Sequence, residues 1–161
     1  MQKTLVALAI SLASAAAMAD SGYYVGADAG TTHSSQLSSG GTVGAFAGYE
    51  WDKNVATELG YEQFPGIQGA GGHAHAIKLD GVLTTYLNKS DTIGLFGFFG
   101  VNDSGATGAG SGFGYDTGLG LRYNFSNNFD ARLRAEYVKL GSTGGYSINE
   151  GDITLGCAYH F

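Results

Sequence analysis

Hydrophobic and polar residues alternate one by one along most of this chain. The pattern is clearest in the last ten residues, where one parity holds Ile153, Leu155, Cys157, Tyr159 and Phe161 and the other holds only small or polar residues. Successive side chains of a β-strand point to opposite faces. The pattern therefore predicts a strand with one wholly apolar face.

Eight segments of this kind follow one another along the chain. Most have 10 to 12 residues, which is about the length that a tilted strand needs to cross a bilayer and about twice that of an ordinary globular strand. They cover residues 23–32, 42–51, 55–64, 74–87, 92–101, 113–124, 129–140 and 152–161. The chain is therefore predicted to be all-β.

The connections between these segments differ in length. Those at 52–54, 88–91 and 125–128 are short and rich in Asn, Asp and Ser, as tight turns require. Those at 33–41, 65–73, 102–112 and 141–151 are longer, so short and long connections alternate without exception. This alternation is typical of a membrane-spanning meander with tight periplasmic turns and longer outer loops.

The two faces of the segments are chemically different. One parity is apolar and remains uncharged until Lys139. The other parity carries many glycines and the charged residues Asp28, Glu50, Glu58, Glu62, Lys78, Asp80, Asp116, Arg122, Asp130, Arg132, Arg134 and Glu136. A soluble barrel would be apolar inside. The pattern instead predicts an eight-stranded antiparallel up-and-down transmembrane β-barrel with a narrow, charged lumen.

Aromatic residues are expected to gather at the two rims of this barrel. With both termini on the periplasmic side, one rim receives Tyr23, Tyr49, Trp51, Tyr123 and Phe129 together with the terminal Tyr159 and Phe161. The other rim receives Tyr61, Phe113, Tyr115 and Tyr137. Two such girdles are what the preference of aromatic rings for membrane interfaces predicts.

The first residues have the features of a secretory signal peptide. Lys3 supplies a positive charge, residues 5–16 form a short apolar stretch, and Ala17-Met18-Ala19 is a cleavage motif. We expect cleavage after Ala19, which leaves residues 20–161 as one barrel domain. An N-terminal membrane anchor is the alternative, and the shortness of the stretch disfavours it.

Charge and cysteine content narrow the function further. Without Lys3 the chain has seven basic and fourteen acidic residues, a balance that argues against a nucleic-acid partner. Cys157 is the single cysteine, so no intramolecular disulfide can form. Its place on an apolar face favours a small hydrophobic residue over a reactive thiol.

At this point the chain resembles a known family: the small eight-stranded outer-membrane proteins of the OmpA transmembrane-domain, OmpX/Ail and opacity-protein type. The resemblance covers all of residues 20–161. It rests on the segments 22–26 (Gly-Tyr-Tyr-Val-Gly), 47–51 (Ala-Gly-Tyr-Glu-Trp), 58–61 (Glu-Leu-Gly-Tyr) and 119–123 (Leu-Gly-Leu-Arg-Tyr) and on the terminal Tyr159-x-Phe161. It implies that Leu155, Cys157, Tyr159 and Phe161 form the signal that the barrel-assembly machinery recognises.

The lumen is the first candidate site. Eight strands enclose an interior that side chains fill, and buried charges must be paired there. We expect an ion cluster of Glu58, Glu62, Lys78, Asp80, Asp116, Arg122, Arg132, Arg134 and Glu136. The cluster is favoured as a plug that fixes the barrel, and a gated ion path is the alternative.

Two other chemistries find little support in the sequence. His73 and His75 share a face and could bind a metal, but no third ligand is apparent, so no metal and no cofactor are predicted. Some barrels of this size modify lipid A through a Ser/His/acid site. Ser147 and Glu150 have no histidine near them in sequence and His160 lies at the other end, so we expect no enzyme.

The sequence thus predicts an integral outer-membrane protein of the porin type from a Gram-negative bacterium. Its expected role is envelope integrity or a surface interaction, with a largely plugged lumen. A small ion-conducting channel and an adhesin or host-factor binder acting through the outer loops are the alternatives. The expected partners are outer-membrane lipid, lipopolysaccharide and the assembly machinery, and the barrel is expected to be a monomer.

Overall fold

The chain forms a closed barrel of eight antiparallel strands. The structure is a computed structural model that describes residues 22–34, 40–65, 73–106, 110–141 and 148–161. Its strands are β1 (Tyr23–Ser34), β2 (Gly40–Asp52), β3 (Val55–Pro65), β4 (His73–Tyr86), β5 (Ile93–Ala106), β6 (Gly110–Asn124), β7 (Phe129–Leu140) and β8 (Ile148–His160).

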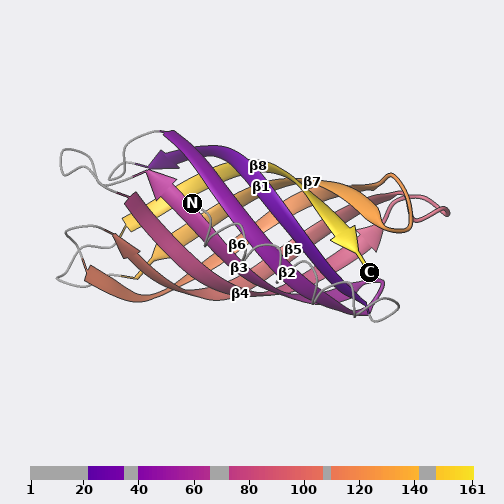
Figure 1. Ribbon diagram of the computed structural model, residues 1–161, viewed down its shortest axis with the longest axis horizontal. Helices are drawn as coiled ribbons and strands as arrows, with labels where there is room; N and C mark the ends of the chain where they lie inside the picture. Colours follow the sequence, from indigo (N-terminus) through magenta and orange to yellow (C-terminus); the bar gives the residue numbers. More distant parts are fainter. Residues whose placement is uncertain (1–21, 35–39, 66–72, 107–109, 142–147) are drawn as a thin grey trace, which may run out of the picture.

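Each strand pairs with the next, and β8 pairs with β1 to close the barrel (Figure 1). This confirms the predicted all-β, up-and-down architecture. In the described ranges, no helix is long and apolar enough to span a bilayer.

The register sends every second side chain to the same side of the wall. Paired residues have the same parity around the barrel, as in Tyr24 opposite His160 across the β1–β8 seam. The register shifts only beside the turn between β2 and β3. Even-numbered side chains therefore point into the lumen and odd-numbered ones point outward. Tyr24 is 1% exposed, whereas Leu83 and Leu155 are each 65% exposed. The apolar face is the outer face, as predicted.

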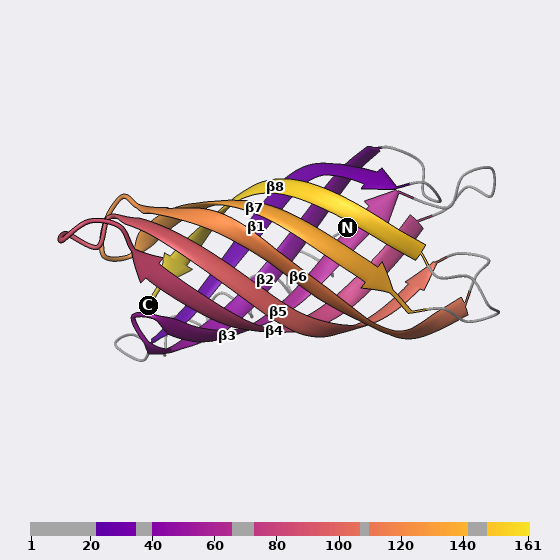
Figure 2. The same cartoon turned by 180° about the vertical axis from the view of Figure 1, so that it is seen from behind.

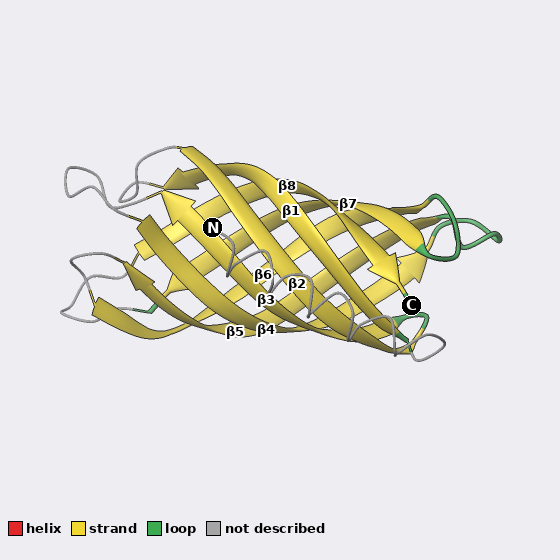
Figure 3. Cartoon of the chain, viewed as in Figure 1, coloured by secondary structure: helices red, strands yellow, loops and turns green. Residues whose placement is uncertain are grey.

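The three short turns and the C-terminus lie at one end of the barrel, which we call the turn end (Figure 3). Local hydrogen bonds explain why Asn, Asp and Ser occupy these turns. Asp52 Oδ1 accepts hydrogen bonds from the backbone amides of Asn54 and Val55, and Asn88 Oδ1 accepts from those of Thr92 and Ile93. Short polar side chains of this kind substitute for backbone partners in tight turns.

At the opposite end, which we call the far end, the strands are longer than the sequence predicted (Figure 2). All four connections predicted to be long are shortened. The largest correction is at 102–112, where only residues 107–109 separate β5 from β6, fewer than the six residues that separate β4 from β5. The strict alternation of short and long connections is therefore wrong.

The ladder continues there because Asn102 pairs with Gly114 and Ser104 with Gly112. The glycine-rich sequence around Gly112 and Gly114 suggested a loop. In the barrel, each of these two glycines instead lies opposite a larger side chain of the lumen. The predicted signal peptide at 1–19 lies outside the described residues.

Candidate functional site

Glu58, on β3, is the centre of the ion network in the lumen. It forms an ion pair with Arg132, and Arg134 Nη2 donates to its other oxygen at 2.9 Å. The hydroxyl of Tyr24 donates to Glu58 Oε1 at 2.7 Å. Arg132 in turn donates through Nε to Asp130 Oδ1 at 2.8 Å. Three strands thus meet at one carboxylate, whose charge is balanced by the two guanidiniums.

A second group of ion pairs lies nearer the far end. Lys78 Nζ donates to Glu62 Oε2 at 2.5 Å and to Glu136 Oε1 at 2.7 Å. Arg134 also lies 3.8 Å from Asp80. All of these side chains are at most 5% exposed. Asp116, also buried, accepts a hydrogen bond of 3.1 Å from Asn102 Nδ2.

A third group lies at the turn end. Arg122 donates to Glu50 at 2.7 Å and lies 3.0 Å from Asp130. His160 Nε2 lies 2.6 Å from Asp130 and 2.8 Å from Arg122 Nη2. The structure therefore places all nine residues of the expected cluster in the lumen, but in three groups instead of one.

The expected cluster did not include Glu50, Asp130 or His160. Glu50 and Asp130 had been placed on the charged, lumen-facing parity, and His160 is likewise an even-numbered strand residue. Asp130 also links the group at the turn end to the Glu58 group, because it contacts both Arg122 and Arg132.

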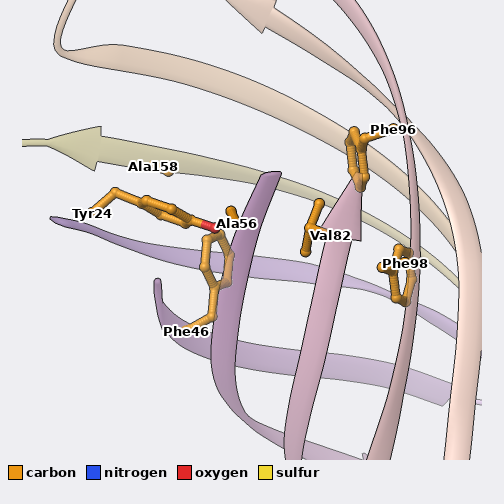
Figure 4. Close-up of a cluster of buried hydrophobic side chains, with 7 residues drawn as sticks. All are labelled: Tyr24, Phe46, Ala56, Val82, Phe96, Phe98 and Ala158. Carbon is orange, nitrogen blue, oxygen red and sulfur yellow. The ribbon is translucent and has the colours of Figure 1, made fainter. Parts of the chain in front are cut away.

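The lumen also holds an aromatic layer that the sequence reasoning missed. Tyr24, Phe46, Phe96 and Phe98 point inward and belong to a buried apolar cluster with three smaller residues, Ala56, Val82 and Ala158 (Figure 4). The guanidinium of Arg132 lies 4.7 Å from the centre of the Tyr24 ring, and that of Arg134 lies 4.4 Å from the centre of the Phe98 ring. Such cation–π contacts stabilise a desolvated guanidinium. Even-numbered aromatics were the signal available in the sequence.

The glycines of the inner face make this layer possible. The register sets Tyr24 opposite Gly48, Phe46 opposite Gly26, Phe96 opposite Gly120 and Phe98 opposite Gly118. A Cβ atom added at any of these glycines would meet the facing ring. Each ring of this layer thus lies over the backbone of a glycine.

A pocket of about 490 Å³ lies at the turn end beside Glu50, Arg122 and His160. Little space remains farther inside, around Glu58 and Lys78. A cavity lined by Asp28, Phe46, Glu62, Lys78 and other inner residues has a volume of about 10 Å³. That is close to the smallest space that can hold one water molecule.

The residues predicted for the girdle point outward at the turn end. Their rings form edge contacts along the rim, with centroids 4.8 Å apart for Tyr23 and Tyr49 and for Tyr49 and Trp51. Phe129 and Tyr159 are 4.9 Å apart. Tyr123 contacts Phe125, which is a turn residue that the prediction did not include.

The residues proposed as the assembly signal lie on β8, except Phe161, which directly follows the strand. Leu155, Cys157 and Tyr159 face outward. The Tyr159 and Phe161 rings are 5.0 Å apart.

The remaining candidates are dispersed. The His75 ring stacks on Tyr61 at 6.4 Å on the outer face. In the part of the chain that the structure describes, no three His, Cys, Asp or Glu side chains are arranged to hold a metal ion. Ser147 lies outside the described residues. Glu150 is buried on the inner face of β8.

A closed barrel with an apolar outer face, an aromatic rim and a charged interior defines the class of integral outer-membrane barrels. The chain belongs to the family of the outer membrane protein beta-barrel domain, whose model matches residues 4–161. Membership in this family implies residence in the outer membrane. No curated protein matches the chain significantly.

Solved structures show the same fold. Neisserial surface protein A is 17% identical with a TM-score of 0.75, and the match covers 88% of this chain and 98% of that one. The N-terminal β-barrel domain of OprF from Pseudomonas aeruginosa is 17% identical with a TM-score of 0.60, over 86% and 97% of the two chains. The outer membrane enzyme PagL is 19% identical with a TM-score of 0.55, over 84% and 97%. Identities this low show the fold alone and transfer no activity.

Proposed function

We propose that this protein is a structural barrel with a plugged lumen that contributes to the integrity of the outer membrane. The observation that carries the proposal is the filling of the middle of the lumen by ion pairs and aromatic rings, which leaves a cavity of about 10 Å³ there. A route for ions would require several of these buried pairs to separate together. Separating a buried ion pair leaves uncompensated charge, at a cost of several kcal/mol.

The proposal includes the orientation and biogenesis of the barrel. Residues 1–19 are removed during export, and the turn end faces the periplasm. Lipid and lipopolysaccharide surround the outer face of a monomer, and the assembly machinery recognises the outward residues of β8. The exposed apolar residues of the outer wall, among them Leu59, Ile77 and Leu119, support a lipid-facing surface.

Planar-bilayer recording tests the plug. The mature protein should be silent, because no described path leads through the ion pairs. Lys78→Ala/Arg132→Ala removes cations from two of the three groups and should produce discrete openings. Stable channels in the wild type would contradict the plug.

A gene-deletion strain tests the envelope role. Loss of the protein should raise sensitivity to detergents and large antibiotics, and the wild-type gene should restore resistance. An unchanged deletion strain would argue against a contribution to integrity. Restoration by the wild type but not by Lys78→Ala/Arg132→Ala would show that the closed lumen is needed.

A small cation channel is the second candidate. The specific observation in its favour is the charge of the inner face, where described carboxylates outnumber the lysine and arginine side chains. An acidic interior attracts cations and excludes anions. If the wild type conducts, the currents should therefore be cation-selective.

A further inference from the structure

The described inner face has more carboxylates than its basic residues can neutralise. Ten carboxylates point inward: Asp28, Glu50, Glu58, Glu62, Asp80, Asp116, Asp130, Glu136, Glu150 and Asp152. The lysine and arginine side chains that face them are Lys78, Arg122, Arg132 and Arg134. Together these four pair with six of the carboxylates. Four carboxylates remain: Asp28, Asp116, Glu150 and Asp152.

Two of the four lie in successive inward positions of β8, in the far half of the barrel. Glu150 and Asp152 are each 2% exposed. Both carboxylate oxygens of each residue are buried without a hydrogen-bond partner among the described residues. Asp116, by contrast, accepts its hydrogen bond from Asn102.

A third polar group faces the same space from the neighbouring strand. Thr32 of β1 lies directly opposite Asp152 in the register and is 1% exposed, and its hydroxyl oxygen also lacks a hydrogen-bond partner. Thr32 is not acidic, so its orphaned hydroxyl is an observation separate from the excess of carboxylates. All three residues present oxygen atoms to one part of the lumen.

The surroundings relieve this charge only in part, because Lys78 acts on both carboxylates from a distance but forms its ion pairs with Glu62 and Glu136. On the other side of Asp152 the register sets Glu136, whose partner is Lys78, and opposite Glu150 lies the fully buried Val138. Val138 belongs to an apolar cluster at the far end with Phe64, Ala74, Ala76 and Leu140. Carboxylates buried beside apolar side chains without a counter-charge are strongly unfavourable. A charge from outside the chain would resolve the imbalance.

The oxygen atoms of Glu150, Asp152 and Thr32 indicate which kind of ion would supply the external charge. Carboxylate and hydroxyl oxygens are ligands of hard cations, and neither nitrogen nor sulfur takes part. No three acidic or histidine side chains in the described ranges converge on one point, so the ion keeps part of its water shell, as Mg²⁺ commonly does. Glu150 is the third residue of β8 and therefore lies nearer the far end than the Glu58 group.

We propose that Glu150 and Asp152, with the hydroxyl of Thr32, bind a partly hydrated divalent cation in the far half of the lumen. The ion neutralises the two carboxylates and ties β8 to β1 where the barrel closes. The three residues form no described ion pair with Lys78, Arg132 or Arg134.

The test is thermal unfolding of the refolded protein in detergent micelles at pH 8, followed by circular dichroism. The wild type is measured in chelator, in millimolar MgCl₂ or CaCl₂, and in NaCl of matched ionic strength. Either divalent salt should raise the melting temperature by several degrees, because a ligand that binds only the folded state stabilises it. NaCl should not.

The decisive variant is Glu150→Gln/Asp152→Asn. In chelator it should melt above the wild type, since the unpaired charges are gone, and the divalent salts should shift it by less than one degree. Asp103→Asn is the matched control, because Asp103 is an exposed acid on the outward parity near the far end. It should keep the wild-type response.

Three outcomes would overturn the site. In the first, neither divalent salt changes the melting temperature of the wild type, as expected if the carboxyls are protonated. In the second, NaCl raises the melting temperature as much as the divalent salts do. In the third, the divalent salts raise the melting temperature of the double variant as much as that of the wild type. If the double variant does not refold, calorimetric titration of chelator-treated wild type with CaCl₂ decides. One bound ion per chain supports the site, and no binding refutes it.

Discussion

At the scale of single residues, the lumen depends on how each side chain is matched by its neighbour across the ladder. Glu58 is matched by two guanidiniums and a phenol, and each large ring is matched by a glycine. Charge and volume are therefore both compensated pairwise. Two substitutions test these two kinds of match separately.

Replacing Glu58 by glutamine tests the charge match. Glu58→Gln leaves Arg132 and Arg134 without their shared carboxylate, and removing one partner of a buried ion pair costs about 3–5 kcal/mol. The free energy of unfolding, measured in denaturant on the refolded protein, should fall by about that amount. Asp91→Asn is the control, because its ion pair with Lys53 is exposed and such pairs contribute about 0–1 kcal/mol. Equal effects of the two variants would contradict the role of Glu58.

Replacing Gly120 by alanine tests the volume match. The new Cβ would collide with the Phe96 ring and lie 2.5 Å from the Leu133 carbonyl oxygen. Overpacking of this kind costs about 1–3 kcal/mol, and the same unfolding assay should detect it. Gly81→Ala is the control, because Gly81 lies on the outward parity and its nearest atom would be 3.8 Å from the added Cβ. A neutral Gly120→Ala would show that Phe96 can move aside.

At the scale of the strand, β8 carries residues with different proposed roles on its two faces. Its inner face carries Glu150, Asp152 and His160, and its outer face carries the residues assigned to the assembly signal. It also closes the barrel against β1, over a register that runs from Tyr24 opposite His160 to Ser34 opposite Glu150. The outward aromatic contacts near its end involve none of the lumen charges.

This separation allows assembly to be tested without opening the lumen. Tyr159→Ala/Phe161→Ala removes two rings of the rim and should lower the fraction of protein folded in the outer membrane, because the assembly machinery loses its signal. The fraction is measured by the heat-dependent gel shift of membrane extracts. Ile153→Ala, on the same face but away from the rim, should have a small effect. An unchanged folded fraction in the double variant would exclude the assigned signal.

At the scale of the whole molecule, the lumen is lined by layers of different chemistry. The aromatic cluster, the Glu58 and Lys78 ion pairs and the apolar cluster at the far end follow one another along the barrel. A barrier made of several layers should remain closed when one of them is thinned. This distinguishes a plug from a gate controlled by a single contact.

Conductance of layered variants tests this arrangement. Phe96→Ala/Phe98→Ala thins only the aromatic layer and should remain silent in planar bilayers, because the ion pairs persist. Adding Lys78→Ala/Arg132→Ala should give larger openings than either double variant alone. Openings in Phe96→Ala/Phe98→Ala as large as those of the quadruple variant would mean that the rings alone block the path.

The sequence predicted the fold well because a barrel repeats one rule in every strand. Alternation identified all eight strands and the side of the wall on which each charge lies. Alternation was less successful at predicting the bounds of strands in glycine-rich segments. The glycine-rich stretch 102–112 resembles a loop, yet most of it belongs to β5 and β6, where Ser104 pairs with Gly112 and Gly105 with Ser111.

What the sequence by itself determined is the class of fold and the face of each residue, because both follow from a period of two that is local to each strand. Which residues meet was decided by the tertiary structure. Tyr24 reaches Glu58 from 34 positions away, and Arg132 reaches it from 74 positions away. Such contacts depend on the stagger and closure of eight strands. The same closure gives most of the inner carboxylates a cation and leaves Glu150 and Asp152 without one.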